Sequence, residues 1–511
     1  MHARMGWIAG AAAAAAAALA LLVMRAALGG PSLPEVVQDA IILATPGPLF
    51  SFMLDQLRFA GRPLLFAAIL VGMFVVGGAI GRAYAARPRS DQAAFRLAAL
   101  LFVLIGLVGF PLLGAGVLGT GRPADVPLWI TTAVAIAVYV GALHLLLRPA
   151  WAEPAGLDRG RRRLLGQAAA GASLAGLALI GWRAFALSGG VAPAPTPQPA
   201  AAGGAAPATA AGHAATEHPT PDITPIDTFY VVSKNFADPR VAAAGWKLRL
   251  DGLVEAPYEL TLDELKALPA VEQPATLCCI SNEVGGDLVG NAHWKGVRLA
   301  DLLQKAGVKA GAVDVVFHCR DDYKDSIAID RATMPGTLVV YEMDGAPLTD
   351  KHGFPARVIV PGIFGMKNAK WLQRIEVVDL DFKGFWQQQG WSDPAPYLTM
   401  SRIDSPTPGG RVAAGPGVVH GIAFAGDRGI STVEVSTDAG VGWREAKLLP
   451  ATGPYSWVRW SFEWDAPAGA RPTLQVRAYD GGGEPQIARP ASPFPDGATG
   501  YHSIQIRVAE A

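Results

Sequence analysis

Apolar residues are concentrated in the first third of the chain, in long and nearly uninterrupted stretches. A helix needs about 20 apolar residues to cross the roughly 30 Å of hydrocarbon in a bilayer. Residues 36–54 are apolar too, but Pro46, Pro48 and Asp39 interrupt them, so we expect an interfacial or re-entrant segment there. The pattern predicts five membrane-spanning helices, at roughly 7–27, 63–85, 97–119, 128–147 and 164–188.

The pattern changes three times after this helical bundle, which we place at residues 1–189. Residues 190–222 are mostly Ala, Pro and Gly, which indicates a flexible tether. Residues 223–398 mix short β-branched stretches with helical repeats, as is typical of an α+β domain. Residues 399–511 alternate apolar and polar positions between Gly, Pro and Asp turns, which favours an immunoglobulin-like β-sandwich. We therefore expect a multi-domain protein with a transmembrane α-helical bundle at its N-terminus.

Composition and charge add an orientation to this picture. An apolar fraction of 51% agrees with a membrane portion. Arginines gather in the loops at 82–96 and 148–163, and the positive-inside rule assigns both loops to the cytoplasm. Five crossings then put everything after residue 189 on the extracytoplasmic side. The first apolar stretch could instead be a signal peptide, although its charge is weak and no clear cleavage site follows it.

Two features of the expected helices carry possible chemistry. The run Arg161-Arg162-Arg163 before the last apolar stretch is either plain positive-inside charge or part of a twin-arginine export signal. His144 is the single histidine within an expected span, so the sequence gives no support for a haem held by paired histidines. It either faces the bundle as a hydrogen-bonding group or marks a quinone or proton site. His213 and His218 fall in the tether and are expected to be bystanders.

The three cysteines cannot form a disulfide framework, because two of them are adjacent. Cys278 and Cys279 end an apolar run and are followed at once by the turn-forming residues Ser281 and Asn282. Such thiols either pack as small apolar side chains or supply a thiolate to a soft metal. Cys319 lies in a β-rich run and is expected in the core.

The residues around these thiols resemble the molybdopterin domain of the sulfite oxidase family. The resemblance rests on Cys279-Ile280-Ser281-Asn282 and on Gly290-Asn291-Ala292-His293-Trp294-Lys295-Gly296. In that family the cysteine of this turn ligates molybdenum, which implies that Cys279 is the metal ligand and the catalytic residue. The implied cofactor is molybdopterin with one molybdenum atom, and a thiolate suits a metal that a pterin dithiolene already holds. Cys278 occupies a position that tolerates an apolar residue.

Two further stretches extend the resemblance to the cofactor-binding residues. They are Phe229 to Asn235, which is similar to the family's first pterin-contacting strand, and His352 to Trp371. Fixed cations and directional donors suit a phosphate and a pterin edge. Asp321 and Asp322 are both compatible with a further polar contact. The resemblance implies cofactor-binding roles for Lys234, Asn235, Asp322, His352, Arg357, Asn368, Ala369 and Lys370.

The C-terminal segment resembles the dimerisation domain of the same family. Its likeness rests on Ser405-Pro406 and on the run from Ser436 to Trp443, and it implies a homodimer, with a membrane-tethered monomer as the alternative. The chain shows neither a cytochrome b5-like domain nor a Cys-x-x-Cys-His motif. Electrons therefore pass to a separate carrier or to the quinone pool. We expect a small-molecule substrate and no nucleic acid among the partners.

The expected function is that of a membrane-anchored, extracytoplasmic, molybdopterin-dependent oxidoreductase that transfers an oxygen atom. Sulfite oxidases carry an arginine just after the cysteine turn and a tyrosine in an Asp-Tyr-Lys-Gly-Phe segment. Here Glu283 and Val284 follow the turn, and Phe382 replaces the tyrosine. A neutral substrate such as a sulfoxide is therefore expected rather than sulfite. The alternatives are a sulfite dehydrogenase, a cofactor-free binding or assembly module that kept the fold, and a transporter with an external sensor.

Overall fold

The computed structural model describes residues 2–28, 32–45, 49, 61–86, 90–120, 127–147, 218–235 and 238–510. The chain divides into two compact units. The first unit is Met1–Gly203 with Ser233–Arg240, and the second is Gly204–Val232 with Val241–Ala511. The expected span at 164–188, the arginine run at 161–163 and most of the tether lie outside the described residues.

The first unit is helical. Within its described residues, four helices are long and apolar enough to cross a membrane: Ala3–Arg25, Leu64–Ala85, Asp91–Leu112 and Leu128–Leu147. They match the first four predicted spans, except that the third begins earlier in the chain than expected. The helices are α1 (His2–Leu28), α2 (Leu33–Ala44), α4 (Gly61–Ala85), α5 (Asp91–Val103), α6 (Phe110–Leu112) and α7 (Leu128–Leu147), with a π-helical turn at Leu104–Gly109 and a 3₁₀ turn at Val117–Gly119.

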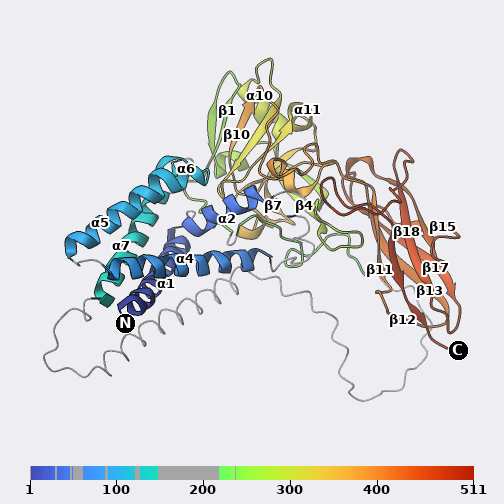
Figure 1. Ribbon diagram of the computed structural model, residues 1–511. Helices are drawn as coiled ribbons and strands as arrows, with labels where there is room; N and C mark the ends of the chain where they lie inside the picture. Colours follow the sequence, from blue (N-terminus) through green and yellow to red (C-terminus); the bar gives the residue numbers. More distant parts are fainter. Residues whose placement is uncertain are drawn as a thin grey trace. The chain divides into compact units, whose positions relative to one another are not determined.

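Small residues let α1 pack closely against α4, and α1 also packs against α7 (Figure 1). A Cβ added to Gly10 would lie 2.2 Å from the carbonyl oxygen of Gly77, and one added to Gly81 would lie 2.5 Å from the Cα of Gly10. Close approach of this kind is how helices associate in lipid, where no hydrophobic force drives them together. The alanine-rich first helix is therefore an integral part of the bundle packing.

The other expectations for this unit concern α2 and His144. At 12 residues, α2 is too short to cross a bilayer, and it begins with a capping box between Ser32 and Glu35. The His144 ring lies 3.1 Å from the Tyr84 hydroxyl through Nδ1 and 3.0 Å from an Asp91 carboxylate oxygen through Nε2. The histidine thus joins three helices, which agrees with the bundle-facing interpretation.

The α+β part of the second unit contains two sheets. In the first, β1 and β10 are parallel and the other pairs are antiparallel. Its order is β2 (Tyr258–Thr261), β1 (Lys247–Gly252), β10 (Leu372–Val378), β5 (Asp314–Cys319) and β6 (Lys324–Ala328). The second sheet is antiparallel, with the order β3 (Val271–Cys278), β4 (Val289–Arg298), β7 (Leu338–Met343) and β8 (Ala346–Pro347), and with β9 (Arg357–Ile359) also paired to β7.

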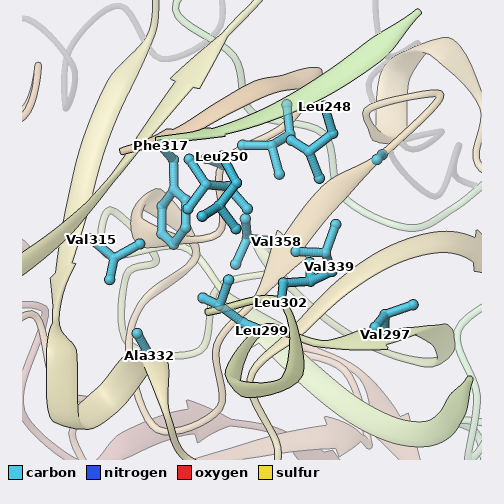
Figure 2. Close-up of a cluster of buried hydrophobic side chains, with 14 of the residues drawn as sticks. Leu248, Leu250, Val297, Leu299, Leu302, Val315, Phe317, Ala332, Val339 and Val358 are labelled. Carbon is cyan, nitrogen blue, oxygen red and sulfur yellow. The ribbon is translucent and has the colours of Figure 1, made fainter. Parts of the chain in front are cut away.

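One hydrophobic core joins these sheets to the short helices α9 (Leu262–Lys266), α10 (Leu299–Ala306) and α11 (Ile329–Ala332). Figure 2 shows Leu248, Phe317 and Val339 gathered with Leu302 of α10. The leucines of α10 recur at helical spacing, so a single face of the helix is buried. This core fixes β9, which carries Arg357, and β4, which pairs with the strand that ends at Cys278.

The C-terminal part is a β-sandwich, which confirms the fold predicted from its alternating pattern. Its core includes Trp460, Val419, Val433 and Val476. One sheet has the order β11 (Met400–Ser405), β13 (Gly415–Phe424), β17 (Val458–Ala466) and β16 (Lys447–Leu448). The other has the order β15 (Arg444–Glu445), β14 (Ile430–Ser436), β18 (Thr473–Asp480) and β19 (His502–Gln505), and β12 (Arg411–Val412) pairs separately with β20 (Arg507–Val508).

Candidate active site

The Cys279 turn lies directly after β3 and is closed by backbone hydrogen bonds. The Cys279 amide donates to the Leu288 carbonyl at 2.9 Å, and the Asn282 amide donates to the Cys279 carbonyl at 3.0 Å. The Asn282 side chain then accepts from the Leu288 amide at 2.9 Å, so the whole loop is tied at its base. The Cys279 thiol lies 3.0 Å from the Ser281 hydroxyl. The turn therefore holds the thiol in a defined position.

The neighbouring thiol has a different environment. The Cys278 thiol donates to the Cys279 carbonyl at 3.5 Å, and the Cys278 amide donates to the Tyr397 hydroxyl oxygen at 3.1 Å. Burial raises the pKa of Cys278 well above the usual range of a thiol. Cys278 therefore stays protonated and serves packing, as the sequence predicted for it.

Two tyrosines border the thiols. A Cβ added to Gly365 would lie 2.7 Å from the Tyr230 hydroxyl and 3.2 Å from the Cys278 carbonyl oxygen, so these groups lie side by side. Burial raises the pKa of both Tyr230 and Tyr397, and the nearby cysteines raise it further. Both phenols are thus neutral hydrogen-bonding groups. Tyr230 belongs to a stretch that the sequence singled out, whereas no motif marked Tyr397.

Arg357 is a buried cation whose charge no carboxylate of the described residues balances. It is 5% exposed and lies over the Trp294 ring, 5.2 Å from the ring centre. Its two terminal nitrogens donate to the carbonyls of His352 at 3.2 Å and Asn368 at 3.0 Å. Among the described residues no carboxylate pairs with it, and its Nε has no hydrogen-bond partner. A buried cation of this kind is costly unless an anion completes the site.

Electrostatics support the same interpretation. Burial lowers the pKa of Arg357 to about 10, so the guanidinium remains charged at neutral pH. Burial, with Arg357 beside it, lowers the pKa of His352 to about 4, so this imidazole is neutral. The His352 ring meets the Phe229 ring edge-on at 5.5 Å, and its Nε2 lies 3.3 Å from the Ile226 carbonyl. This site thus combines one fixed positive charge with a neutral ring.

The structure brings five of the predicted residues together, on β9 and on the turns that precede and follow it. The Val358 amide donates to the Ala369 carbonyl at 2.9 Å, which joins β9 to the turn that carries Asn368 and Lys370. Gly353 lies between the side chains of Lys370 and Arg357, since a Cβ added to it would be 3.0 Å from the Lys370 Cβ and 3.2 Å from the Arg357 Cβ. Its φ of 105° also favours glycine. The cluster consists of His352, Arg357, Asn368, Ala369 and Lys370.

Within this cluster, Asn368 and Lys370 make contacts to the chain itself. The Asn368 side chain accepts from the Val360 amide at 2.6 Å and donates to the Phe364 carbonyl at 3.3 Å. Lys370 donates to the Lys351 carbonyl at 3.0 Å. Asn368 therefore shapes the turn that presents its neighbours.

The remaining predicted cofactor residues are Lys234, Asn235 and Asp322. Lys234 and Asn235 fall in the segment that groups with the helical unit, where the Lys234 ammonium lies 3.3 Å from a carboxylate oxygen of Asp39 and both side chains are buried. Asp322 lies in the turn between β5 and β6 with a φ of 60°, and its amide donates to the carbonyl of the buried Cys319 at 3.1 Å. Sequence reasoning missed the pairing with Asp39, because 195 positions separate the two residues.

Comparison with known proteins finds a molybdopterin-binding domain in the part of the chain that holds these residues. Residues 235–386 match the profile of the oxidoreductase molybdopterin binding domain. The chain is 32% identical over 282 residues to a sulfite oxidase of Arabidopsis thaliana, a match that covers 45% of this chain and 71% of the relative. It is 34% identical over 146 residues to an uncharacterized oxidoreductase of Bacillus subtilis, covering 29% of this chain and 72% of that protein. It is 32% identical over 287 residues to a mitochondrial sulfite oxidase of Drosophila melanogaster, covering 47% of this chain but only 50% of that relative.

Proposed function

Because the chain belongs to the sulfite oxidase family of molybdopterin-dependent oxidoreductases, we propose that it transfers an oxygen atom on a small, uncharged substrate outside the cytoplasm. The family implies a molybdenum cofactor. The long apolar helices of the first unit suggest that the enzyme is anchored in a membrane. Substrate, orientation and electron partner are parts of the proposal.

The observation that carries the proposal is the unbalanced charge of Arg357 in the domain that also holds the Cys279 turn. The donor set fits the cofactor: a thiol for the metal, and for an anionic group a buried guanidinium that no carboxylate of the described residues pairs with. Cys279 would ligate molybdenum, and Arg357, with His352 and Lys370 beside it, would hold the phosphate and the pterin edge. When bound, the cofactor supplies two-electron oxygen-atom exchange.

The side chains at the positions where sulfite oxidases carry an arginine and a tyrosine support an uncharged substrate. Glu283 and Val284 follow the turn, and Phe382 occupies the position of the family's tyrosine. A carboxylate about 4 Å from an anionic substrate would cost on the order of 1 to 4 kcal/mol in high to intermediate dielectric. Arg402 reaches this loop, but it is paired with Asp404. The loop therefore offers an anion no free positive charge from Arg402.

Reduction of a sulfoxide satisfies these constraints: R₂SO with two protons and two electrons gives R₂S and water. The electrons would come from a separate carrier or from the quinone pool. Tyr230 and Tyr397, both neutral, are placed beside the thiols and could donate hydrogen bonds to a neutral oxygen.

Two measurements test the proposal. Analysis of matured, membrane-extracted protein should find molybdenum and pterin in equal amounts, and their absence would favour the cofactor-free binding or assembly module. A steady-state comparison of sulfite oxidation with reduction of small sulfoxides and N-oxides should favour the latter. Efficient sulfite turnover at micromolar concentrations would instead identify a sulfite dehydrogenase.

Export and domain organisation belong to the same proposal. We place the boundaries at 1–189, 190–222, 223–398 and 399–511, with the sandwich available for a homodimer. Changing Arg161, Arg162 and Arg163 to Lys keeps the positive charge but removes the twin-arginine signature. If that signature directs export, protease added to intact cells will no longer reach the catalytic domain. Unchanged cleavage would favour plain positive-inside charge.

A further inference from the structure

Arg402, in strand β11 of the sandwich, reaches the loop that follows the Cys279 turn. One terminal nitrogen of Arg402 donates to the Gly286 carbonyl at 2.7 Å. The Gly286 amide donates to the Glu283 carbonyl at 2.9 Å, so the contact acts on a loop that is already tightly turned. A side chain from another part of the unit therefore holds the residues directly after the predicted metal ligand.

A second contact from the sandwich supports the same loop. A Cβ added to Gly285 would lie 2.3 Å from the His502 ring, so this ring lies directly against the loop backbone. The Nδ1 of His502 accepts from the Ile403 amide at 3.0 Å, which fixes the ring beside Arg402. The loop is thus held by β11 and β19 together.

Asp404 neutralises Arg402 and is itself held from the opposite side. One of its carboxylate oxygens accepts from the Arg402 Nε at 2.5 Å, and the other accepts from the Thr220 hydroxyl at 2.5 Å. Both members of the ion pair are mostly buried, with side chains 14% and 10% exposed. A buried pair of opposite charges presents almost no net charge to its surroundings.

Thr220 belongs to a short segment, residues 218–222, that is bound to the sandwich. The Nε2 of His218 lies 3.2 Å from the carbonyl oxygens of Gly421 and Trp460, which are paired across β13 and β17. Asp222 forms an ion pair with Arg459 at 2.7 Å. The end of the tether is therefore anchored, and His218 is part of that anchor.

The charge of Arg402 lies at the loop that follows Cys279. Its guanidinium donates to the Gly286 carbonyl at 2.7 Å, seven residues after the predicted metal ligand. An unpaired arginine at this position would therefore attract an anion to the region of the Cys279 turn, as any charge within a few ångströms of a desolvated site does.

We propose that Asp404 is a specificity-determining residue: it keeps Arg402 as a neutral pair on the loop after Cys279, so the arginine positions this loop and does not bind an anionic substrate. This inference rests on the proposed preference for an uncharged substrate and gives it a structural cause. Thr220 assists by holding the second oxygen of Asp404. Arg402 and Asp404 act through the loop and are positioning residues in this sense.

The test compares binding of inorganic sulfate to the wild-type holoenzyme and to the Asp404→Asn variant. Asparagine keeps the shape but removes the charge, so sulfate should bind roughly tenfold more tightly, as expected for one released charge near a partly buried site. Titration of the Mo(V) paramagnetic resonance signal and the sulfate-dependent shift in Tm both report this binding. An unchanged sulfate affinity would overturn the proposal.

A double-mutant cycle assigns the effect to the arginine. In Arg402→Gln/Asp404→Asn the added sulfate affinity should disappear, and persistence of the gain would overturn the proposal. Thr220→Val, which removes a single contact of Asp404, should move the affinity in the same direction by less. It serves as the readout if Asp404→Asn does not fold, and a Thr220→Val affinity equal to that of wild type would then count against the inference.

The positioning part has its own readout and a matched control. Arg402→Gln should speed hydrogen exchange in residues 283–288 and lower kcat more than it changes KM. Glu434→Gln breaks a comparable arginine pair, with Arg477, inside the sandwich and should change neither exchange in this loop nor sulfate binding. Sulfite turnover by the wild-type enzyme bears on the proposed function alone, whereas the ratio of sulfate affinities between variant and wild type bears on Asp404.

Discussion

Two buried cations of the α+β domain, Arg357 in β9 and Lys367 in a 3₁₀ turn, have different surroundings. The Lys367 ammonium lies 2.9 Å from an Asp325 carboxylate oxygen and 3.0 Å from one of Asp393, and it donates to the Ser326 carbonyl at 2.9 Å. Arg357 donates to carbonyls, and among the described residues it has no carboxylate partner. A buried cation that the chain neutralises is part of the framework, whereas one that it leaves unbalanced indicates a place for an anionic ligand.

The largest expected effect comes from replacing Cys279, the predicted protein ligand of the cofactor's metal. Cys279→Ala should abolish turnover and leave the fold intact, because the cofactor loses its protein thiolate while the residues around Arg357 keep their contacts. Cys278→Ala should cost only about 1 kcal/mol of unfolding free energy, since it removes one small buried group. Activity and the Mo(V) resonance of the two variants check this, and the opposite ranking would show that the ligand is misassigned.

The next effect should come from the unbalanced cation. Arg357→Met keeps much of the side-chain volume but removes the charge, so the purified protein should lose most of its pterin. Without cofactor, the unfolding free energy should stay within about 1 kcal/mol of wild type or rise, because the costly buried charge is gone. Pterin analysis and denaturant unfolding of the cofactor-free protein measure both. Full pterin content in the variant would contradict the assignment of Arg357 to cofactor binding.

Lys367, the cation that the chain itself neutralises, should respond in the opposite way to Arg357. Lys367→Met leaves Asp325 buried without its partner and should reduce the unfolding free energy by about 3–5 kcal/mol, with or without cofactor. Lys383→Met is the matched control, since Lys383 also pairs with Asp393 but is half exposed, and it should cost less than about 1 kcal/mol. Equal effects from the two lysine variants would remove the distinction between framework and ligand cations.

The smallest effect concerns pH. The pKa of His352 is about 4 in the folded protein and about 6.5 when unfolded, so between these values the unfolded chain binds the extra proton. Stability should therefore fall as the pH falls from 6.5 to 4, by up to about 3 kcal/mol from this residue. His352→Gln should flatten that part of the curve for cofactor-free protein. Above pH 7 the difference between the two proteins should be constant, because the ring is neutral in both states.

Much of the architecture was predictable because its signals are contiguous in sequence. Apolar stretches of span length mark four of the described helices, and the alternation after residue 399 marks the sandwich. The turn after Cys278 and the cluster from His352 to Lys370 lie within short motifs. Residues so close along the chain have few ways to separate in space, so the sequence largely determined their grouping.

What the tertiary structure decided depends on residues far apart along the chain. Tyr397 meets Cys278 across 119 positions, Arg402 meets Gly286 across 116, and Thr220 meets Asp404 across 184. Strand order and domain packing bring these pairs together, and no local spacing encodes them. That no carboxylate in the described part of the chain pairs with Arg357 is of the same kind. Whether a buried charge is balanced depends on every group around it, and only the folded chain brings those groups together.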